Sequence, residues 1–317
     1  MKRIIKCVVI NLMIMILLLA VVEVFIWGYT KYNNKGFEGS EFRYVFFDPM
    51  LHMGDLDYYF NPERHTPTVG RLPEGLEFKS SPILIFGCSF AYGQWLEQSQ
   101  TLGHKLSVIL QRPVYNRAVG GQSLQEMYFQ SESPVFYKQV PDAGSAIYVM
   151  IDDAYRRTYV NICEYMDTWF LLHYDIKNGE LVYQDYSNPV LNFLKSLYIA
   201  KLFNTTYYTK FIDNPKNAEK VTDDALLYFV KTRENLEKHF GHKVNFYVVI
   251  YDFVHYHDIL AKKLSENDFV VIETEKITSE NLLDDKYVIE GDGHPSETAW
   301  TLLTPLFAEI IQENEKE

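Results

Sequence analysis

Cysteine and positive charge are both scarce in this sequence of 317 residues. The three cysteines, Cys7, Cys88 and Cys163, are scattered along the chain, which excludes a disulfide framework and a cysteine-based metal set. Lysine and arginine number 30 against 42 acidic residues, so the formal net charge is −12. A protein that follows nucleic-acid phosphates needs a basic stripe, and we therefore expect no nucleic-acid partner.

What the sequence does contain is typical of a globular protein. Hydrophobic residues make up 47% of the chain and charged residues 23%, which excludes wholesale disorder. The length suits one large domain or two small ones. Tyrosine is abundant, with 24 residues. Tyrosines fill cores and also contact sugars, and of these two interpretations we favour the core.

An apolar run at residues 7–28 is long enough to span a bilayer as a helix. Lys2, Arg3 and Lys6 precede it, and the positive-inside rule then leaves the N-terminus in the cytoplasm. We therefore expect a single-pass anchor (residues 1–30) in the cytoplasmic membrane, with the remainder extracytoplasmic. A cleaved signal peptide is the alternative, but its apolar region is usually shorter and no small-x-small site follows Trp27.

The rest of the chain divides into a connector and one main domain. Residues 31–80 form an irregular pattern and are expected to pack on the domain formed by residues 81–317. Apolar runs predict five strands, at residues 82–86, 114–116, 146–151, 244–250 and 269–272. Helical periodicity predicts four helices, at residues 101–111, 122–132, 225–239 and 296–312. The alternation of strands and helices predicts an α/β fold, a three-layer sandwich around a mainly parallel five-stranded sheet.

Residues 155–220 interrupt this alternation and are interpreted as an insertion over one end of the sheet. Within it, Asn178 and Gly179 separate two short apolar segments, which predicts a β-hairpin. A hydrophobic helix is expected around residues 190–202.

Ser89 is the candidate nucleophile. It follows the first predicted strand, between Gly87 and Gly93, where a helix is expected to begin. Ligands of open α/β sheets bind beyond the carboxyl ends of the strands. A serine in this turn has its hydroxyl exposed at that edge, although a strand-to-helix turn also needs small residues for purely structural reasons.

His294 and Asp292 are the candidate base and its orienting acid. They lie two residues apart, directly before the last predicted helix. A serine nucleophile needs a base to accept its proton, and the base needs an acceptor on its other ring nitrogen. Two further segments are expected at the carboxyl edge of the sheet. The segment that carries Gly121 follows the second predicted strand, and Asp152 follows the third.

A metal site is the alternative chemistry. His255 and His257 alternate with acidic residues between Asp252 and Asp258. We interpret this segment as a solvated loop and expect neither a metal nor a cofactor.

Together these segments resemble the SGNH (GDSL-like) hydrolases over about residues 80–310. FGCSFAYG resembles the first block with Ser89 as nucleophile, NRAVGG the second with Gly121, and GDGHPS the fifth with His294 and Asp292. The resemblance implies an oxyanion hole from the backbone N–H groups of Ser89 and Gly121. The family's third oxyanion donor, an asparagine side chain, aligns with Asp152, and an ionised carboxylate cannot donate.

The resemblance implies a flavodoxin-like sheet and a serine esterase or acyltransferase that needs no cofactor. By analogy with membrane-anchored bacterial members, the expected substrate is an acylated cell-surface polysaccharide. Two alternatives stay open: a non-catalytic glycan-binding protein on the same fold, and a lipase or thioesterase.

Overall fold

A computed structural model describes residues 17–18, 20–22, 24, 81–118, 120–140, 142–160, 174–183, 207–251 and 254–316. The predicted connector (31–80), the predicted helix at 190–202 and most of the apolar run at 7–28 lie outside these residues. Within the described parts of the chain, no helix combines the length and apolarity that crossing a bilayer requires.

The centre of the molecule is a sheet of five strands in the order β2-β1-β3-β6-β7. All neighbouring strands in it run parallel, so the predicted α/β fold is confirmed. The strands are β1 (Ile83–Gly87), β2 (Val114–Asn116), β3 (Ser145–Met150), β6 (Asn245–Ile250) and β7 (Val270–Glu273).

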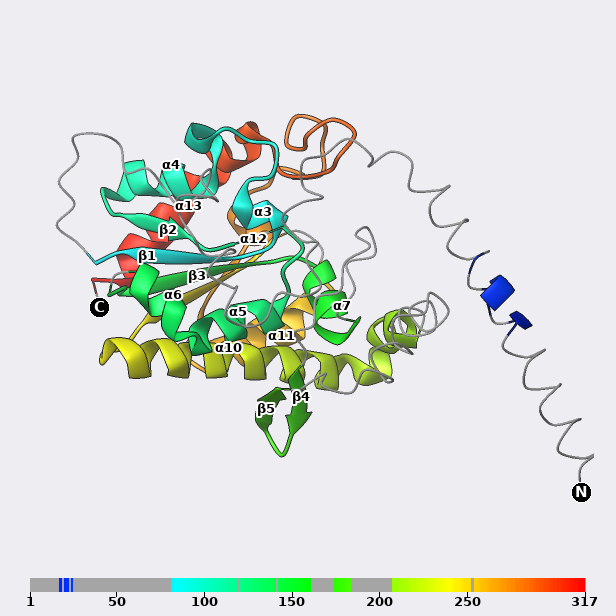
Figure 1. Cartoon of the computed structure of the whole chain (residues 1–317). Helices are drawn as coiled ribbons and strands as arrows, with labels where there is room; N and C mark the ends of the chain where they lie inside the picture. Colours follow the sequence, from blue (N-terminus) through cyan, green and yellow to red (C-terminus); the bar gives the residue numbers. More distant parts are fainter. Residues whose placement is uncertain are drawn as a thin grey trace, which may run out of the picture.

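Helices cover both faces of the sheet, which gives three layers (Figure 1). On one face lie α4 (Leu102–Leu110) and α13 (Glu297–Asn314). On the other lie α5 (Leu124–Glu132), α10 (Ala218–Phe240) and α11 (His257–Glu266). Successive strand residues point to opposite faces, so Leu84 joins the core beneath α5 and α10 while Ile83 joins the one beneath α4 and α13.

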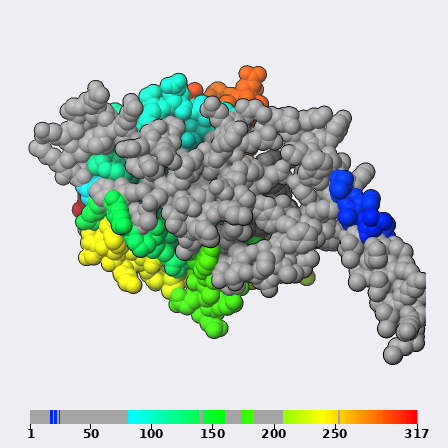
Figure 2. Space-filling model, in the orientation of Figure 1, coloured from blue at the N-terminus to red at the C-terminus, as the bar shows by residue number. Residues whose placement is uncertain are grey.

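The described structure also contains shorter elements. Among them are α3 (Ser89–Tyr92), η4 (Gln98–Gln100), α6 (Pro134–Gln139), α7 (Asp153–Val160), η5 (Pro215–Asn217) and α12 (Thr274–Ile277). The predicted hairpin is present as β4 (Tyr174–Lys177) and β5 (Glu180–Tyr183), an antiparallel pair. It projects from the surface beside α10, as Figure 2 shows.

The strand order places a topological switch between β1 and β3, because the chain crosses to β2 on one side of β1 and to β3 on the other. Ligands bind at such a switch, beyond the carboxyl ends of the strands. The register pairs Gly87 with Val149 and Met150 with Ile250. The segments that follow β1, β3 and β6 therefore leave the sheet at one edge.

One predicted loop is corrected by the structure. Residues 252–258 were expected to form a solvated loop, but His257 and Asp258 make the first turn of α11. That helix buries Leu260, Ala261 and Leu264, which is an apolar stripe at helical spacing.

Candidate active site

Ser89 lies at the turn from β1 to α3 and is 6% exposed. The turn depends on Gly87, whose φ is +137°. A Cβ at this position would lie 3.0 Å from the carbonyl oxygen of Val149 and 3.0 Å from the Cβ of Ala91. A glycine is therefore required for the chain to turn this closely against β3 and present Ser89 at the sheet edge.

His294 is held by the folded segment before α13. The backbone N–H of Ile289 donates to the carbonyl of His294, and the N–H of Ser296 donates to Tyr287. Gly291 and Gly293 have positive φ values of 75° and 83°, so the chain turns tightly on both sides of Asp292. This turn brings the side chains of two nearly adjacent residues together.

The two segments meet in a serine–histidine–aspartate arrangement. Nε2 of His294 lies 2.7 Å from Oγ of Ser89, within hydrogen-bonding distance. Nδ1 of the same ring contacts Oδ2 of Asp292. A carboxylate that accepts from Nδ1–H leaves Nε2 unprotonated and able to accept the serine proton.

Burial controls the charge of this imidazole. Burial is the largest influence on His294 and lowers the pKa of its ring below the ordinary value of 6.5, while Asp292 acts in the opposite direction. A lowered pKa keeps the ring neutral at pH 7, and the neutral ring is the form that acts as a base.

Aromatic packing fixes the His294 ring from the side. The Phe90 ring lies 5.1 Å from the ring of His294 and 5.3 Å from that of Tyr251. Tyr251 in turn packs 5.6 Å from Trp300, which is fully buried. Because Phe90 follows Ser89, the side chains that support the base and the turn that carries the nucleophile belong to one packed group.

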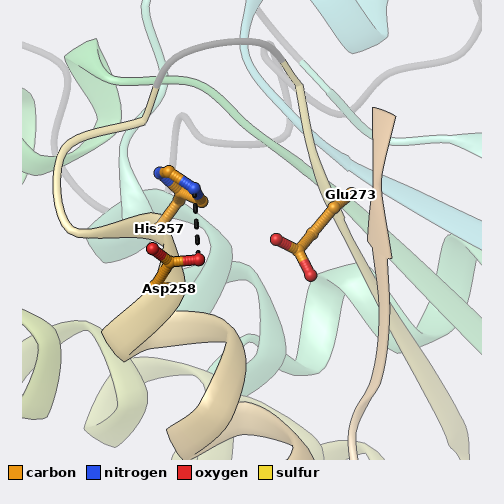
Figure 3. A group of neighbouring side chains, drawn as sticks. All are labelled: His257, Asp258 and Glu273. Carbon is orange, nitrogen blue, oxygen red and sulfur yellow. Dashed lines mark ion pairs between the residues drawn. The ribbon is translucent and has the colours of Figure 1, made fainter. Parts of the chain in front are cut away.

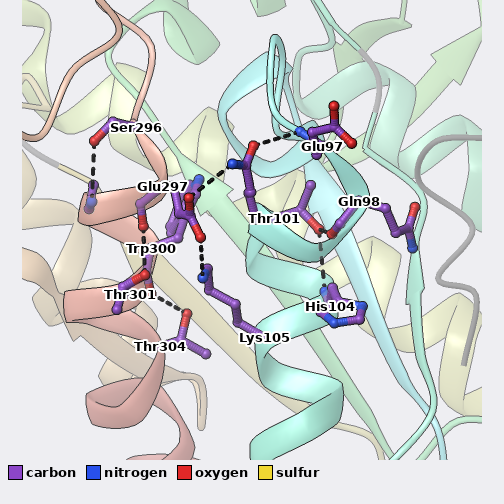
Figure 4. Close-up of polar contacts among 12 residues, drawn as sticks. Glu97, Gln98, Thr101, His104, Lys105, Ser296, Glu297, Trp300, Thr301 and Thr304 are labelled. Atoms are coloured by element: carbon purple, nitrogen blue, oxygen red, sulfur yellow. Dashed lines mark hydrogen bonds and ion pairs between the residues drawn. The ribbon is translucent and has the colours of Figure 1, made fainter. Parts of the chain in front are cut away.

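A group of polar side chains, which we call the brace, connects the Ser89 and His294 segments a few residues from the two side chains. Glu297, the first residue of α13, accepts hydrogen bonds from Gln100 (2.9 Å) and from Lys105 (3.3 Å). Figure 4 shows Glu297 reaching Lys105, beside the capped start of α4 at Thr101. The brace links the chain after Ser89 to the chain after His294, so we infer that it helps keep the two side chains in register.

The Gly121 segment is anchored to the same turn. Asn116 donates from Nδ2 to the carbonyl of Ala91 (2.7 Å) and accepts from the N–H of Ala118 (3.0 Å). Gly121 itself has a φ of 81°, which favours glycine. Its role as an oxyanion donor stays a prediction.

Asp152, which aligns with the family's third oxyanion donor, is paired with His255 in the structure. Its Oδ1 accepts from the backbone N–H of His255 (2.8 Å) and lies 2.6 Å from Nδ1 of the same residue. Its Oδ2 lies 3.8 Å from Arg156. The carboxylate is therefore engaged as an acceptor and offers no donor to an oxyanion. Sequence analysis considered His255 only as a possible metal ligand and missed this contact with Asp152, although both residues follow neighbouring strands of the sheet.

Comparisons with known proteins reveal likeness in fold. No protein-family model matches the sequence, and no curated protein matches it. A member of the lipolytic protein G-D-S-L family from Veillonella parvula DSM 2008 is similar at 13% identity and a TM-score of 0.43, over 74% of this chain and 99% of that chain. A carbohydrate esterase family 2 enzyme plus carbohydrate binding domain from Corynascus thermopiles (Myceliophthora fergusii) is similar at 11% identity and a TM-score of 0.45. The similarity covers 76% of this chain and 68% of that chain.

A third similar structure is an acetyl xylan esterase from the rumen bacterium Butyrivibrio proteoclasticus, at 8% identity and a TM-score of 0.38, over 75% of this chain and 64% of that chain. What this chain does is inferred below from its own side chains.

Proposed function

We propose that this chain is a serine esterase or acyltransferase of the SGNH type that acts on acyl groups of a cell-surface polysaccharide. The observation that carries the proposal is the 2.7 Å approach of His294 Nε2 to Ser89 Oγ, with Asp292 at the other ring nitrogen. Residues from opposite ends of the domain, 205 positions apart, meet in the geometry that nucleophilic acyl transfer needs.

In the first step, Ser89 Oγ attacks the ester carbonyl and its proton passes to Nε2 of His294. Asp292 stabilises the imidazolium that forms. The protonated ring then gives this proton to the leaving alkoxide, so that an alcohol departs and an acyl-serine remains. In the second step, water or a sugar hydroxyl attacks the acyl-serine by the reverse sequence, and Ser89 is regenerated.

The tetrahedral intermediate carries a negative oxygen that needs donors. We assign the backbone N–H groups of Ser89 and Gly121 as the donors to this oxygen. Asp152 contributes no donor, because its carboxylate is engaged with His255 and Arg156. Loss of one oxyanion donor typically costs about 2.7–4 kcal/mol of transition-state stabilisation. We therefore expect a modest turnover on simple esters.

A glycan substrate is supported by aromatic side chains near the insertion. Tyr207 is 63% exposed and Tyr183 38% exposed. Tyr207 packs on Tyr208 and Phe211 in one aromatic group. An exposed, supported aromatic ring offers a flat and half-polar surface on which a sugar can stack.

We further propose that residues 7–28 anchor the chain in the cytoplasmic membrane with the main domain outside. The large apolar side chains described in this run are exposed: Leu17, Leu18, Val21, Val22 and Val24. Fractionation of cells that express the full chain tests the anchor. The chain should sediment with membranes and resist carbonate extraction, and release by carbonate would refute the span.

The esterase proposal is tested with Ser89→Ala in the full chain. Hydrolysis of a small acetyl ester should fall by at least about 10⁴-fold, because removal of the nucleophile leaves only binding and oxyanion stabilisation. Ser265→Ala, an exposed serine on α11, is the matched control and should leave the rate unchanged. Equal turnover by wild type and Ser89→Ala would eliminate Ser89 as the nucleophile.

A non-catalytic glycan-binding protein is the second candidate, and the acceptor state of Asp152 favours it. A fluorophosphonate probe separates the two, because it labels an activated serine covalently. Labelling of wild type but not of Ser89→Ala supports the enzyme. A folded wild-type chain that resists labelling while it binds polysaccharide supports the binding protein. Faster turnover of long-chain acyl esters or thioesters than of acetyl esters would favour a lipase or thioesterase.

A further inference from the structure

Asp152 leaves the sheet beside the proposed nucleophile. The register of β1 and β3 pairs Gly87 with Val149. Two residues farther along, Ser89 and Ile151 leave these neighbouring strands, and Asp152 is the next residue. Neighbouring strands lie about 4.8 Å apart. The side chain of Asp152 therefore starts close to the place where the ester carbonyl must lie during attack by Ser89.

A second observation places α7, the helix that Asp152 precedes, near the catalytic base. Burial is the main cause of the lowered pKa of His294, and the positive charge of Arg157 on α7 adds to it. The interaction between charges declines with distance. An influence of Arg157 on His294 therefore means that this helix begins close to the proposed site.

A carboxylate at this position is unfavourable for acyl transfer. The tetrahedral intermediate carries a negative oxygen, and an ionised carboxylate repels it and has no proton to donate. Charge near a developing oxyanion has a large effect on the rate, because water is partly excluded from such sites. Turnover at Ser89 therefore requires that the carboxylate of Asp152 be directed elsewhere.

Two residues hold the carboxylate of Asp152. Its Oδ1 accepts from the backbone N–H of His255 (2.8 Å) and lies 2.6 Å from Nδ1 of the same residue, while its Oδ2 lies 3.8 Å from Arg156. An aspartate before a helix usually caps the first N–H groups of that helix. Here the N–H groups of Ala154 and Tyr155 donate instead to backbone carbonyl oxygens. The side chain of Asp152 is directed across to the segment after β6.

We propose that His255 is a positioning residue, which holds the carboxylate of Asp152 away from the oxyanion that forms at Ser89. This inference rests on the proposed esterase function. Two donors of one residue converge on a single carboxylate oxygen, which fixes the position of the carboxylate and the direction in which it points. The ring is also held from its other side, where Nε2 lies 3.7 Å from Asp213. His255 thus acts through Asp152, and it is assigned no contact with the substrate.

Two other histidines that face carboxylates are matched controls. His257 follows His255 by two residues and pairs with Asp258 at 3.3 Å, as Figure 3 shows. His242 precedes β6, at the edge where the strands begin, and its Nε2 lies 2.6 Å from Oδ1 of Asp142. The side chains of His242 and His255 are 40% and 41% exposed. The first control reports on disturbance of the local segment, and the second on loss of an equivalent histidine–carboxylate pair elsewhere.

The test measures kcat and KM for a small acetyl ester in variants of the full chain. His255→Ala should lower kcat by about 10-fold and leave KM within about 2-fold, because the released carboxylate opposes a charge that develops only in the transition state. His255→Asn should retain most of the turnover, since its amide can donate from near the position of Nδ1. His257→Ala and His242→Ala should turn over as wild type does. Unchanged kcat in His255→Ala would overturn the proposal.

Variants that lack the carboxylate decide whether His255 acts through Asp152. Asp152→Ala alone should leave kcat at or above the wild-type value. In this background, His255→Ala should cause no further loss, because no carboxylate remains to be held. An equal loss of kcat with and without Asp152 would overturn the proposal, since His255 would then act independently of this carboxylate. A large loss in Asp152→Ala alone would also overturn it, because the carboxylate would then be required.

Labelling by a fluorophosphonate distinguishes failure of this proposal from failure of the proposed function. His255→Ala should label more slowly than wild type but to the same final extent, whereas an unfolded fraction would lower the extent. A folded wild-type chain that neither hydrolyses the ester nor labels at Ser89 would refute the esterase function, and this inference with it. An active wild type in which the effect of His255→Ala does not depend on Asp152 would refute this inference alone.

Discussion

At the scale of single residues, the protonation of His294 sets the pH range of the proposed reaction. Burial lowers the pKa of this ring below 6.5, and only the neutral ring accepts the Ser89 proton. We expect kcat/KM for a small ester to rise with pH and to reach half its plateau below pH 6.5. A half-point above pH 6.5 would contradict this, since it would mean that Asp292 outweighs burial.

The lowered pKa of His294 also affects the stability of the fold. Its effect on the pH dependence of unfolding is opposite to that of a histidine whose charged form is stabilised by folding. The unfolded chain binds a proton at its ordinary pKa of about 6.5, while the folded chain does so only at lower pH. The neutral ring therefore contributes stability above pH 6.5, and this contribution is lost as pH falls through the folded pKa. His294→Gln should remove this part of the pH dependence of unfolding.

Sequence reasoning located the residues of the site better than it located their partners. Ser89 and His294 were identifiable because each follows or precedes an element of predicted type and is flanked by glycines. The link between Asp152 and His255 spans 103 positions and leaves no local pattern. It depends on the pairing of β3 with β6, which a single sequence does not display.

At the scale of elements, the turns that end helices depend on space as well as on backbone conformation. Gly93 ends α3 and Gly241 ends α10, with φ values of 80° and 77°. A Cβ on Gly93 would lie 2.6 Å from Cγ2 of Thr101, whereas a Cβ on Gly241 would meet nothing within 4 Å. The two glycines thus form a matched pair that differs in packing.

We expect Gly241→Ala to lower the free energy of unfolding by about 1–2 kcal/mol, the cost of positive φ for alanine. Gly93→Ala should cost about 1–3 kcal/mol more, because the added methyl overpacks Thr101. Thr101→Ser in the Gly93→Ala background removes Cγ2 but keeps the hydroxyl that caps α4, and should recover most of the extra loss. Equal losses at the two glycines in denaturant titrations would refute the packing explanation.

The central strands β1, β3 and β6 were predictable because each is a short apolar run, buried on both faces, that periodicity identifies. Some helices were missed for the opposite reason, and α7 and α11 are two of them. α7 carries Asp153, Arg156 and Arg157 along a short segment, and α11 begins with His257 and Asp258. These polar residues mimic a loop, and the helices form because Tyr155 and Leu260 bury their apolar faces against the core.

At the scale of the whole molecule, the edge where the strands end and the edge where they begin have different roles. The carboxyl edge carries the proposed chemistry, with its exposed turns and partly buried charges. At the opposite edge, the buried Arg112 side chain donates to the Ser81 carbonyl (2.8 Å), to Ser145 (3.2 Å) and to Glu315 near the end of α13. This group connects β2, β3 and the last helix at the edge where the strands begin.

Loss of this connection should therefore affect stability without affecting chemistry. Glu315→Ala leaves Arg112, whose side chain is 8% exposed, with an uncompensated charge. We expect the free energy of unfolding to fall by about 1–2 kcal/mol, because Glu315 is itself 26% exposed and solvent screens part of the pairing. Glu313→Ala removes an exposed acid from the same helix and should change stability by less than about 0.5 kcal/mol. Ester turnover per folded molecule should be the same in both variants, and a drop confined to Glu315→Ala would mean that the two edges are coupled through α13, which also carries Glu297 and the brace beside His294.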